Sequence, residues 1–295
     1  MKSAIIVLLG LLTVQTVWGG DNATPAAPER DLKILSWNIY MLPALVPMAG
    51  RLERAKGIVD TLQKTDYDII VFQEAFHRKA VTAIHDGLKS KYPYSYGPFN
   101  PANSPFKISS GVWVLSRIPL QVLDSIEYHD KKDVDCFARK GAVLLQGEFN
   151  GKKFQLMGTH MQSNENRADI RSLQFQQMHR ELLYKHHIDG IPQILCGDMN
   201  TEATIQKEYC EMLNCLDAEN ADYEGIQKET YDGVTNRLAE LAWKKQKTTF
   251  DYILLRSNGA KIRSIRRYVS VMRKLWKKDR FDLSDHYGVS CEVRF

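Results

Sequence analysis

The feature that most constrains the fold of this chain is a series of short apolar runs, each about as long as a β-strand and several followed by a polar side chain. Strands that are buried on both faces appear as continuous apolar runs between polar or turn residues, so the pattern predicts a molecule built around β-sheets. The predicted strands are 33–37, 69–72, 111–115, 142–149, 154–159, 193–196, 250–255 and 287–295.

Two of the segments between these strands have the spacing of amphipathic helices. The positions on one helical face are Leu52, Ala55, Ile58, Val59 and Leu62 in the first, and Ile170, Leu173, Met178 and Leu182 in the second, which spans 166–187. Asn150-Gly151 indicates a tight hairpin between two strands. Hairpins mixed with strand–helix units favour sheets with antiparallel pairs. We therefore predict an α/β (α+β) fold, a four-layer αββα sandwich of two stacked mixed or antiparallel sheets flanked by helices.

The first twenty residues have the composition of a secretory signal peptide. Lys2 precedes an apolar stretch from Ala4 to Trp18, and the small residues Gly19 and Gly20 follow it. The stretch is shorter than the roughly 20 residues that span a bilayer, although an uncleaved anchor stays the alternative. We expect a signal peptide at 1–20, a flexible segment at 21–30, and an extracellular or periplasmic location. No linker or repeat interrupts 31–295, which predicts a single domain there.

Composition and cysteine usage narrow the class of protein. A hydrophobic content of 44% supports a substantial core, and a net charge of +5 is too small by itself to indicate a nucleic-acid partner. The five cysteines are an odd set, so at least one thiol stays free, and none forms a Cys-x-x-Cys motif. Cys196 and Cys291 lie in apolar strands and should be buried. Cys210 and Cys215 are close enough to pair if the intervening turn permits it.

Polar residues suited to metal and phosphate chemistry lie at the ends of six of the predicted strands. They are Asn38, Glu74, His160, Asp198, Asp251 and the adjacent pair Asp285-His286. One such residue alone is more often an ordinary turn or structural residue. Six in one chain favour divalent-metal phosphoester chemistry, because carboxylate and amide oxygens bind hard cations and imidazoles transfer protons.

The individual positions suggest roles. Glu74 emerges where a buried strand leaves the core, which suits a ligand of Mg²⁺, and Asn38 would orient it or contact the metal. Asp198 and Asn200 are two residues apart, so an extended backbone would point both at a phosphate or its attacking water.

The Asp285-His286 pair and His160 complete the predicted site. On an extended backbone Asp285 and His286 point to opposite sides, so one can face a metal and the other a water. A neutral His286 is a suitable general base, with Asp251 as its orienting carboxylate. His160 could bind phosphoryl oxygens or protonate the leaving group.

Two segments carry a resemblance to a known family. Ser36–Pro43 and Phe72–Phe76, with the strand-end residues above, resemble the endonuclease/exonuclease/phosphatase (DNase I-like) superfamily, and most closely its secreted neutral sphingomyelinases (sphingomyelinase C). The resemblance implies a monomeric enzyme that hydrolyses sphingomyelin to ceramide and phosphocholine with Mg²⁺, or with Mn²⁺ or Co²⁺. It implies Glu74, Asn38 and Asp285 around the metal. The catalytic residues that it implies are His286, His160, Asp251, Asp198 and Asn200.

The sequence departs from this branch at one disulfide. Secreted bacterial members often join a cysteine before the middle strands to one just after the Thr-His motif. Cys136 resembles the first, but 163–171 contains no cysteine. We expect that link to be absent here, with consequences for stability and loop order rather than for catalysis.

A basic segment near the carboxyl end suggests a membrane contact. Residues 261–280 hold nine Lys or Arg and one acid, Asp279. Leu275 and Trp276 lie within it, where that branch has a hairpin with exposed aromatics, so they are candidate membrane-binding residues on a sphingomyelin-containing surface. The alternative is a hairpin whose apolar face packs into the core. A nucleic-acid backbone would also attract this charge.

Two other functions stay open. One is an extracellular DNase I-like nuclease, because phosphodiester hydrolysis needs the same metal and base. The other, of a different class, is a non-catalytic membrane-binding module. The complete set of candidate polar groups disfavours the module.

Overall fold

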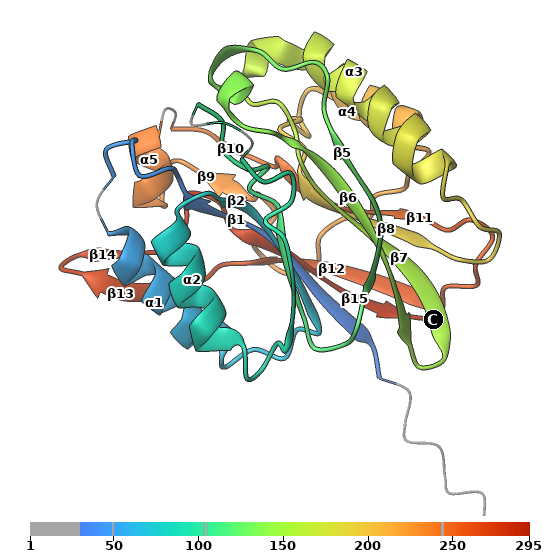
Figure 1. Cartoon of the computed structure of the whole chain (residues 1–295), viewed down its shortest axis with the longest axis horizontal. Helices are drawn as coiled ribbons and strands as arrows, with labels where there is room; N and C mark the ends of the chain where they lie inside the picture. The colour runs from blue at the N-terminus through green and yellow to red at the C-terminus, as the bar shows by residue number, and fades with distance from the viewer. Residues whose placement is uncertain (1–29, 49, 103, 105, 243–244) are drawn as a thin grey trace, which may run out of the picture.

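The computed structural model describes residues 30–48, 50–102, 104, 106–242 and 245–295. The predicted signal peptide and all but the last residue of the predicted flexible segment lie outside these ranges. Two β-sheets form the centre of the molecule (Figure 1). The first has the order β12 (Ser264–Ser270), β15 (Gly288–Arg294), β1 (Leu32–Met41), β2 (Ile69–Ala75), β4 (Trp113–Ser116) and β3 (Tyr94–Tyr96). The second has the order β11 (Asp251–Arg256), β8 (Gln193–Asp198), β7 (Lys152–His160), β6 (Gly141–Phe149) and β5 (Gln121–Glu127).

Helices cover the outer face of each sheet, as Figure 1 shows. The first sheet carries α1 (Arg51–Leu62) and α2 (Arg78–Leu88). The second carries α3 (Ala168–Met178), its π-helical continuation His179–Tyr184, and α4 (Gln206–Leu216). The smaller elements are the 3₁₀ turns Asp133–Phe137 and Glu165–Arg167, the pair β9 (Tyr231–Asp232) and β10 (Lys247–Thr248), α5 (Arg237–Ala242), and the hairpin of β13 (Arg273–Lys277) and β14 (Arg280–Asp282). The predicted αββα sandwich is confirmed.

Strict alternation along the strands divides the core into three layers. In β1, Ile34 faces the second sheet while Leu35 faces α1 and α2. In β8, Ile194 faces the first sheet while Leu195 faces α3 and α4. Successive side chains of a strand point to opposite faces, so apolar residues at every position fill both layers at once. This is why the strands appear as unbroken apolar runs in the sequence.

Most local predictions are confirmed, with two differences on the helices. Asn150 and Gly151 form the β6–β7 turn with φ of 51° and 72°, the left-handed conformation that such a turn requires. Leu52 and Leu173, which were expected on the buried faces of their helices, are 49% and 43% exposed. In α1 the place of Leu52 is taken by Arg54, which lies on the same face as Ile58 and Leu62. No helix in the described part of the chain is long and apolar enough to cross a bilayer.

All five cysteines are free thiols. Cys196 and Cys291 are buried, as predicted. Cys210 and Cys215 do not pair, because both lie on α4 and residues five apart on a helix point in different directions. Cys136 is also free, as expected, and its thiol donates to the carbonyl of Lys131.

Polar contacts hold together the two segments that the missing disulfide would join. Asp135 Oδ2 accepts hydrogen bonds from the backbone N of Ser163 at 2.6 Å and from its hydroxyl at 2.9 Å. Nearby, Arg167 and Asp133 form an ion pair at 2.8 Å. These contacts connect the 3₁₀ turn Asp133–Phe137 to the loop after β7.

Candidate active site

Four of the predicted site residues face inward at one end of the space between the sheets. Asn38, His160 and Asp198 lie at or near the carboxyl ends of their strands, and Asp251 begins the antiparallel strand β11. His160 and Asp251 are both register partners of Asp198, from the strands on either side of β8. Asn38, from the first sheet, reaches across and donates from Nδ2 to Asp198 Oδ2 at 3.0 Å. All four are buried. The inward-facing positions of these strands are therefore apolar in the middle of the sheets and polar at this end, where they form a cluster.

Glu74 reaches the same place through an irregular backbone. Val71 and Gln73 point between the sheets, so simple alternation would send Glu74 toward the helices on the outer face. Instead Glu74 has a φ of 56°, and β1 opposite carries one extra residue between Asn38 and Met41. The bulge redirects the side chain, and Asn38 Nδ2 donates to Glu74 Oε1 at 3.1 Å. Asn38 thus connects Glu74 to Asp198.

His286 forms a dyad with Asp251. Its Nδ1 lies 2.7 Å from Asp251 Oδ2, and its Nε2 lies 3.9 Å from Asp198 Oδ2. Asp251 accepts the Nδ1 proton, and Nε2 is the ring nitrogen directed toward Asp198. The indole N–H of Trp37 donates to the carbonyl of His286 at 3.0 Å and fixes the loop. The rings of Tyr231 and Phe250 pack beside the imidazole, with centroids 5.4 and 6.3 Å away.

The electrostatics of the dyad suit a proton acceptor. Burial lowers the pKa of His286, but the carboxylates of Asp251 and Asp198 outweigh it and hold this pKa well above its usual value. Burial raises the pKa of Asp251 to about 6, against the opposing effect of the imidazolium of His286. A proton taken up by Nε2 is therefore strongly held.

Glu74 and Asp285 form a pair of acids suited to a divalent cation. Glu74 as a residue is partly exposed, but its Oε2 atom is buried and has no hydrogen-bond partner. Burial, and then the charge of Asp285, raise the pKa of Glu74 to about 7. Burial likewise raises the pKa of Asp285. Two buried carboxylates that disfavour each other's ionisation, one with an unpaired oxygen, are the donor set that a hard cation needs.

A second group of possible ligand atoms overlaps the dyad. Asp198, Asp251 and His286 each present a ligand atom within 4.8 Å of the others. The 2.7 Å contact between His286 Nδ1 and Asp251 already uses the imidazole edge that faces that carboxylate.

Arg54 supports both loops of the acidic pair, and the sequence did not single it out. Its guanidinium is completely buried and donates to the carbonyls of Ile39 at 3.1 Å, Tyr40 at 2.6 Å and Leu283 at 2.9 Å. Tyr40 lies in the β1 bulge, with a φ of 50°, and Leu283 begins the loop that carries Asp285. Arg54 therefore fixes the bulge next to Glu74 against the loop of the dyad.

Asn200 lies beside Asp198, but not on the extended backbone that was expected. Its φ is 49°, and its backbone N donates to Asp198 Oδ1 at 3.0 Å in a tight turn. The side-chain amide of Asn200 donates to the carbonyl of Met161 at 3.1 Å. The turn, rather than strand alternation, keeps the two side chains together.

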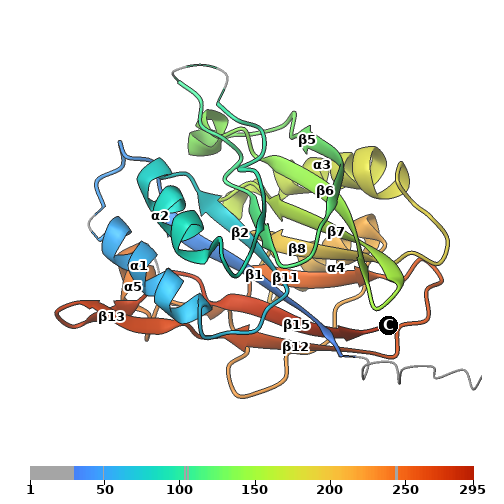
Figure 2. The same ribbon diagram turned by 60° about the horizontal axis from the view of Figure 1, so that its bottom comes forward.

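The basic segment 261–280 is divided between two elements. Its first part forms β12, an edge strand of the first sheet, and its last part forms the β13–β14 hairpin, which projects beyond the sheets beside α1 (Figures 1 and 2). Trp276 packs against the core side of the hairpin and its indole N–H donates to Asp282 O at 2.9 Å. Leu275 and Phe281 are 57% and 49% exposed. The hairpin thus combines an inward tryptophan with outward apolar residues.

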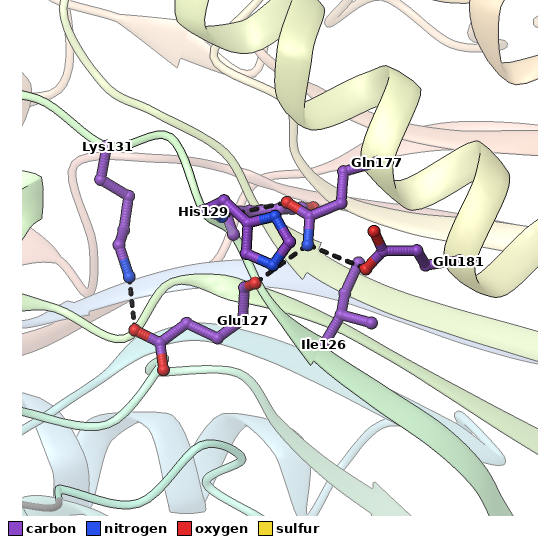
Figure 3. Close-up of a pocket in the computed structure, with 7 residues that line it drawn as sticks. Ile126, Glu127, His129, Lys131, Gln177 and Glu181 are labelled. Atoms are coloured by element: carbon purple, nitrogen blue, oxygen red, sulfur yellow. Dashed lines mark hydrogen bonds and ion pairs between the residues drawn. The ribbon is translucent and has the colours of Figure 1, made fainter.

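A polar pocket of about 440 Å³ lies elsewhere, between the end of β5 and α3 (Figure 3). Its polar groups bind one another: Gln177 Nε2 donates to the carbonyl of Glu127 at 3.1 Å and to Glu181 Oε2 at 3.0 Å. The backbone N of His129 donates to Gln177 Oε1 at 3.0 Å. None of its lining residues belongs to the predicted site.

Comparisons with known proteins identify the family of the chain. The model of the Endonuclease/Exonuclease/phosphatase family matches residues 35–286. The chain is 30% identical over 289 residues to Sphingomyelinase C 2 of Leptospira interrogans, covering 88% of this chain and 45% of that protein. It is 26% identical over 320 residues to Phospholipase C of Staphylococcus aureus, covering 98% of this chain and 96% of that protein.

Solved structures agree on the fold. A crystal structure of a beta toxin variant from Staphylococcus aureus, which has bound magnesium ions, matches with a TM-score of 0.79 at 24% identity, over 90% of this chain and 100% of that chain. Against the first two curated relatives, the chain spans only about half of their length, 45% and 55%.

Proposed function

Because the chain belongs to the endonuclease/exonuclease/phosphatase family, we propose that it is an exported, Mg²⁺-dependent phosphodiesterase that hydrolyses sphingomyelin to ceramide and phosphocholine. The observation that carries the proposal is the His286–Asp251 dyad, with Nε2 3.9 Å from Asp198, beside the acidic pair of Glu74 and Asp285. The similarity to proteins named sphingomyelinase C supports the lipid substrate. Residues 31–295 would act as one monomeric catalytic domain.

His286 would act as the general base of the reaction. A water between its Nε2 and Asp198 would lose a proton to Nε2 and attack phosphorus in line with the bond to the ceramide oxygen. Asp251 would stabilise the imidazolium that forms, because it already accepts the Nδ1 proton. Asp198 and Asn200 would orient the water and the phosphate. The P–O bond to the ceramide oxygen would break, and the departing alkoxide would take a proton from solvent water to give ceramide.

Glu74 and Asp285 would hold the cation, with Asn38 fixing Glu74 through the 3.1 Å hydrogen bond. Bound Mg²⁺, or Mn²⁺ or Co²⁺ in its place, would neutralise charge on the phosphate and on the departing alkoxide. Asn38 also donates to Asp198, so the same amide would fix the spacing between the acidic pair and the attacking water.

The deciding experiment is an assay of phosphocholine release from sphingomyelin vesicles by the purified chain, with Mg²⁺ and with EDTA. Phosphatidylcholine vesicles and plasmid DNA serve as rival substrates. We expect Mg²⁺-dependent release from sphingomyelin and much less reaction with the other two. Nicked DNA with intact lipid would instead make the chain a nuclease, and lipid binding without turnover would make it a membrane-binding module.

The hairpin would contact the bilayer through its exposed apolar residues. We expect Leu275→Asp to reduce activity on sphingomyelin vesicles about tenfold or more, because it replaces an apolar side chain at the lipid surface by a charge. Activity on a water-soluble phosphocholine ester should not change. The charged Lys277 and Lys278 nearby would favour anionic surfaces.

The matched control is Leu173→Asp on α3, in the helix layer of the other sheet, where the leucine is 43% exposed. This variant should keep full activity on vesicles. Equal losses on vesicles and on the soluble ester in Leu275→Asp would show that the hairpin supports the active site rather than the membrane contact. Trp276 is a poorer probe, because it packs inward and its loss would disturb the hairpin itself.

A further inference from the structure

Lys140 is a buried lysine next to the active site that the mechanism above does not use. It lies just before β6 and is 2% exposed. Its ammonium contacts Asp135 Oδ1 at 2.8 Å, the carbonyl of Met161 at 2.8 Å and His160 Nε2 at 3.1 Å. A lysine ammonium has three N–H donors and no acceptor, so these contacts engage every donor that it has.

The contact with Lys140 determines which nitrogen of His160 carries the proton. Since the ammonium can only donate, Nε2 of His160 must accept, and the ring proton resides on Nδ1. An Nε2–H would place two donors face to face at 3.1 Å in a buried environment. A doubly protonated ring would add a second positive charge there, which burial also disfavours.

The charges around His160 also favour the neutral form of its ring. The groups that face it are Lys140 from just before β6, Asp198 from β8, and His286 from the loop before β15. Burial, and then the charge of Lys140, lower the pKa of His160 to about 3, and Asp198 only partly opposes them. Asp135 neutralises Lys140 itself, and it is held by Ser163.

Lys140 also reaches the other side of the site. The carbonyl of Met161 accepts from Lys140 at 2.8 Å and from the side chain of Asn200 at 3.1 Å. One ammonium therefore fixes the imidazole of His160 and, through a shared carbonyl, the amide beside Asp198.

We propose that Lys140 is a positioning residue that holds His160 as the neutral Nδ1–H tautomer, so that His160 binds by hydrogen bonding while His286 alone of the two imidazoles exchanges a proton in turnover. Of the two roles expected for His160, the geometry disfavours protonation of the leaving group, because Lys140 occupies Nε2 and the protonated Nδ1 is a buried atom without a hydrogen-bond partner. The part about turnover rests on the proposed function, whereas the tautomer does not.

The tautomer can be measured directly by NMR on ¹⁵N-histidine-labelled protein, in which long-range ¹H–¹⁵N correlations distinguish Nδ1–H from Nε2–H. His160→Gln identifies the signals of His160. In the unmodified chain we expect the neutral Nδ1–H form from about pH 5 to about pH 8, where an ordinary histidine titrates. An Nε2–H form, or titration of His160 in this range, would overturn the proposal.

Two variants test the role of Lys140. In Lys140→Met we expect His160 to change to the Nε2–H form, because Asp198 Oδ2, 3.7 Å away, becomes its only charged neighbour on that edge. Lys140→Arg should preserve the Nδ1–H form. An unchanged tautomer in Lys140→Met would refute the role. Since Lys140→Met leaves Asp135 buried without its cation, the double variant Asp135→Asn with Lys140→Met provides a folded alternative with the same expected change.

Kinetics provide a second readout. We expect Lys140→Met to lower kcat by about 10- to 100-fold with little change in KM, and Lys140→Arg to recover much of the loss. Normal kcat in a variant whose tautomer has changed would overturn the catalytic part. If the unmodified chain did not hydrolyse sphingomyelin, the proposed function would fail while the NMR result would still decide the tautomer.

Discussion

We expect His286→Ala to lower kcat for phosphodiester hydrolysis by about 10²–10⁴-fold, the contribution typical of a general base. The reason is geometric: the Nδ1 of His286 is bound to Asp251 at 2.7 Å, so Nε2 is the ring nitrogen that faces Asp198 and can exchange a proton there. The measurement is steady-state release of phosphocholine at saturating Mg²⁺. The melting temperature, recorded in parallel, should show that the variant is folded.

Two further variants make the result specific. Asp251→Asn keeps the shape of the orienting group but not its charge. We therefore expect this variant to have a lower kcat as well, with its affinity for Mg²⁺ little changed. His187→Ala removes an exposed histidine that pairs only with exposed Asp189, and it should have normal kcat. Less than a tenfold loss in His286→Ala would mean that another group takes the proton.

The sequence predicted the parts of the site that follow from regular strands. Asn38, His160 and Asp198 face inward at or near the carboxyl ends of their strands, and Asp251 faces inward at the start of β11. Alternation in a two-sided apolar run is visible in the sequence. The strands themselves were predicted for the same reason. The edge strands β3, β5 and β12 were missed, because most of their residues are exposed or half-buried and they form no continuous apolar run.

Residues whose position depends on irregular backbone or on tertiary contacts could not be predicted. The orientation of Glu74 depends on a bulge in β1 that no residue type in 38–41 specifies. Asn200 was placed on an extended backbone, but a left-handed turn places it instead. Lys140 was not singled out, because Asp135, which pairs with it, comes from a turn outside the sheet.

Arg54 was missed although its spacing carried a signal. It lies four residues before Ile58 and eight before Leu62, on the buried stripe of α1. A basic residue in such a stripe is usually assigned to solvent, because a buried arginine needs partners that cannot be seen in the local sequence. Its partners are carbonyls from β1 and from the loop after β14, which are distant in the chain.

The second large effect concerns Glu74, for which we expect Glu74→Gln to reduce Mg²⁺-dependent turnover at least about 100-fold. The amide keeps the size of the side chain and its contact with Asn38, but it lacks the charge that a hard cation needs. The measurement is kcat as a function of Mg²⁺ concentration. Glu148→Gln, at an exposed position on β6, is the matched control and should behave as the unmodified chain.

Glu74→Gln should have opposite effects on the free energy of unfolding with and without the metal. Burial, and then Asp285, raise the pKa of Glu74 from 4.5 to about 7 in the folded chain, so the folded state holds this proton more tightly than the unfolded state. In EDTA, the contribution of Glu74 to the free energy of unfolding therefore falls as pH rises from about 4.5 through about 7. Above that range Glu74→Gln should be more stable than the unmodified chain, by up to about 3 kcal/mol.

Saturating Mg²⁺ should reverse this order, because the cation binds the unmodified chain more tightly than the variant and stabilises it by mass action. Urea denaturation from about pH 5 to about pH 8, with EDTA and with Mg²⁺, measures both effects. If the two proteins had parallel pH profiles in EDTA, the carboxylate of Glu74 would be well solvated and the acidic pair would not be a cation site. A crossing of the two stability orders on adding Mg²⁺ would instead identify Glu74 as a metal ligand independently of any substrate.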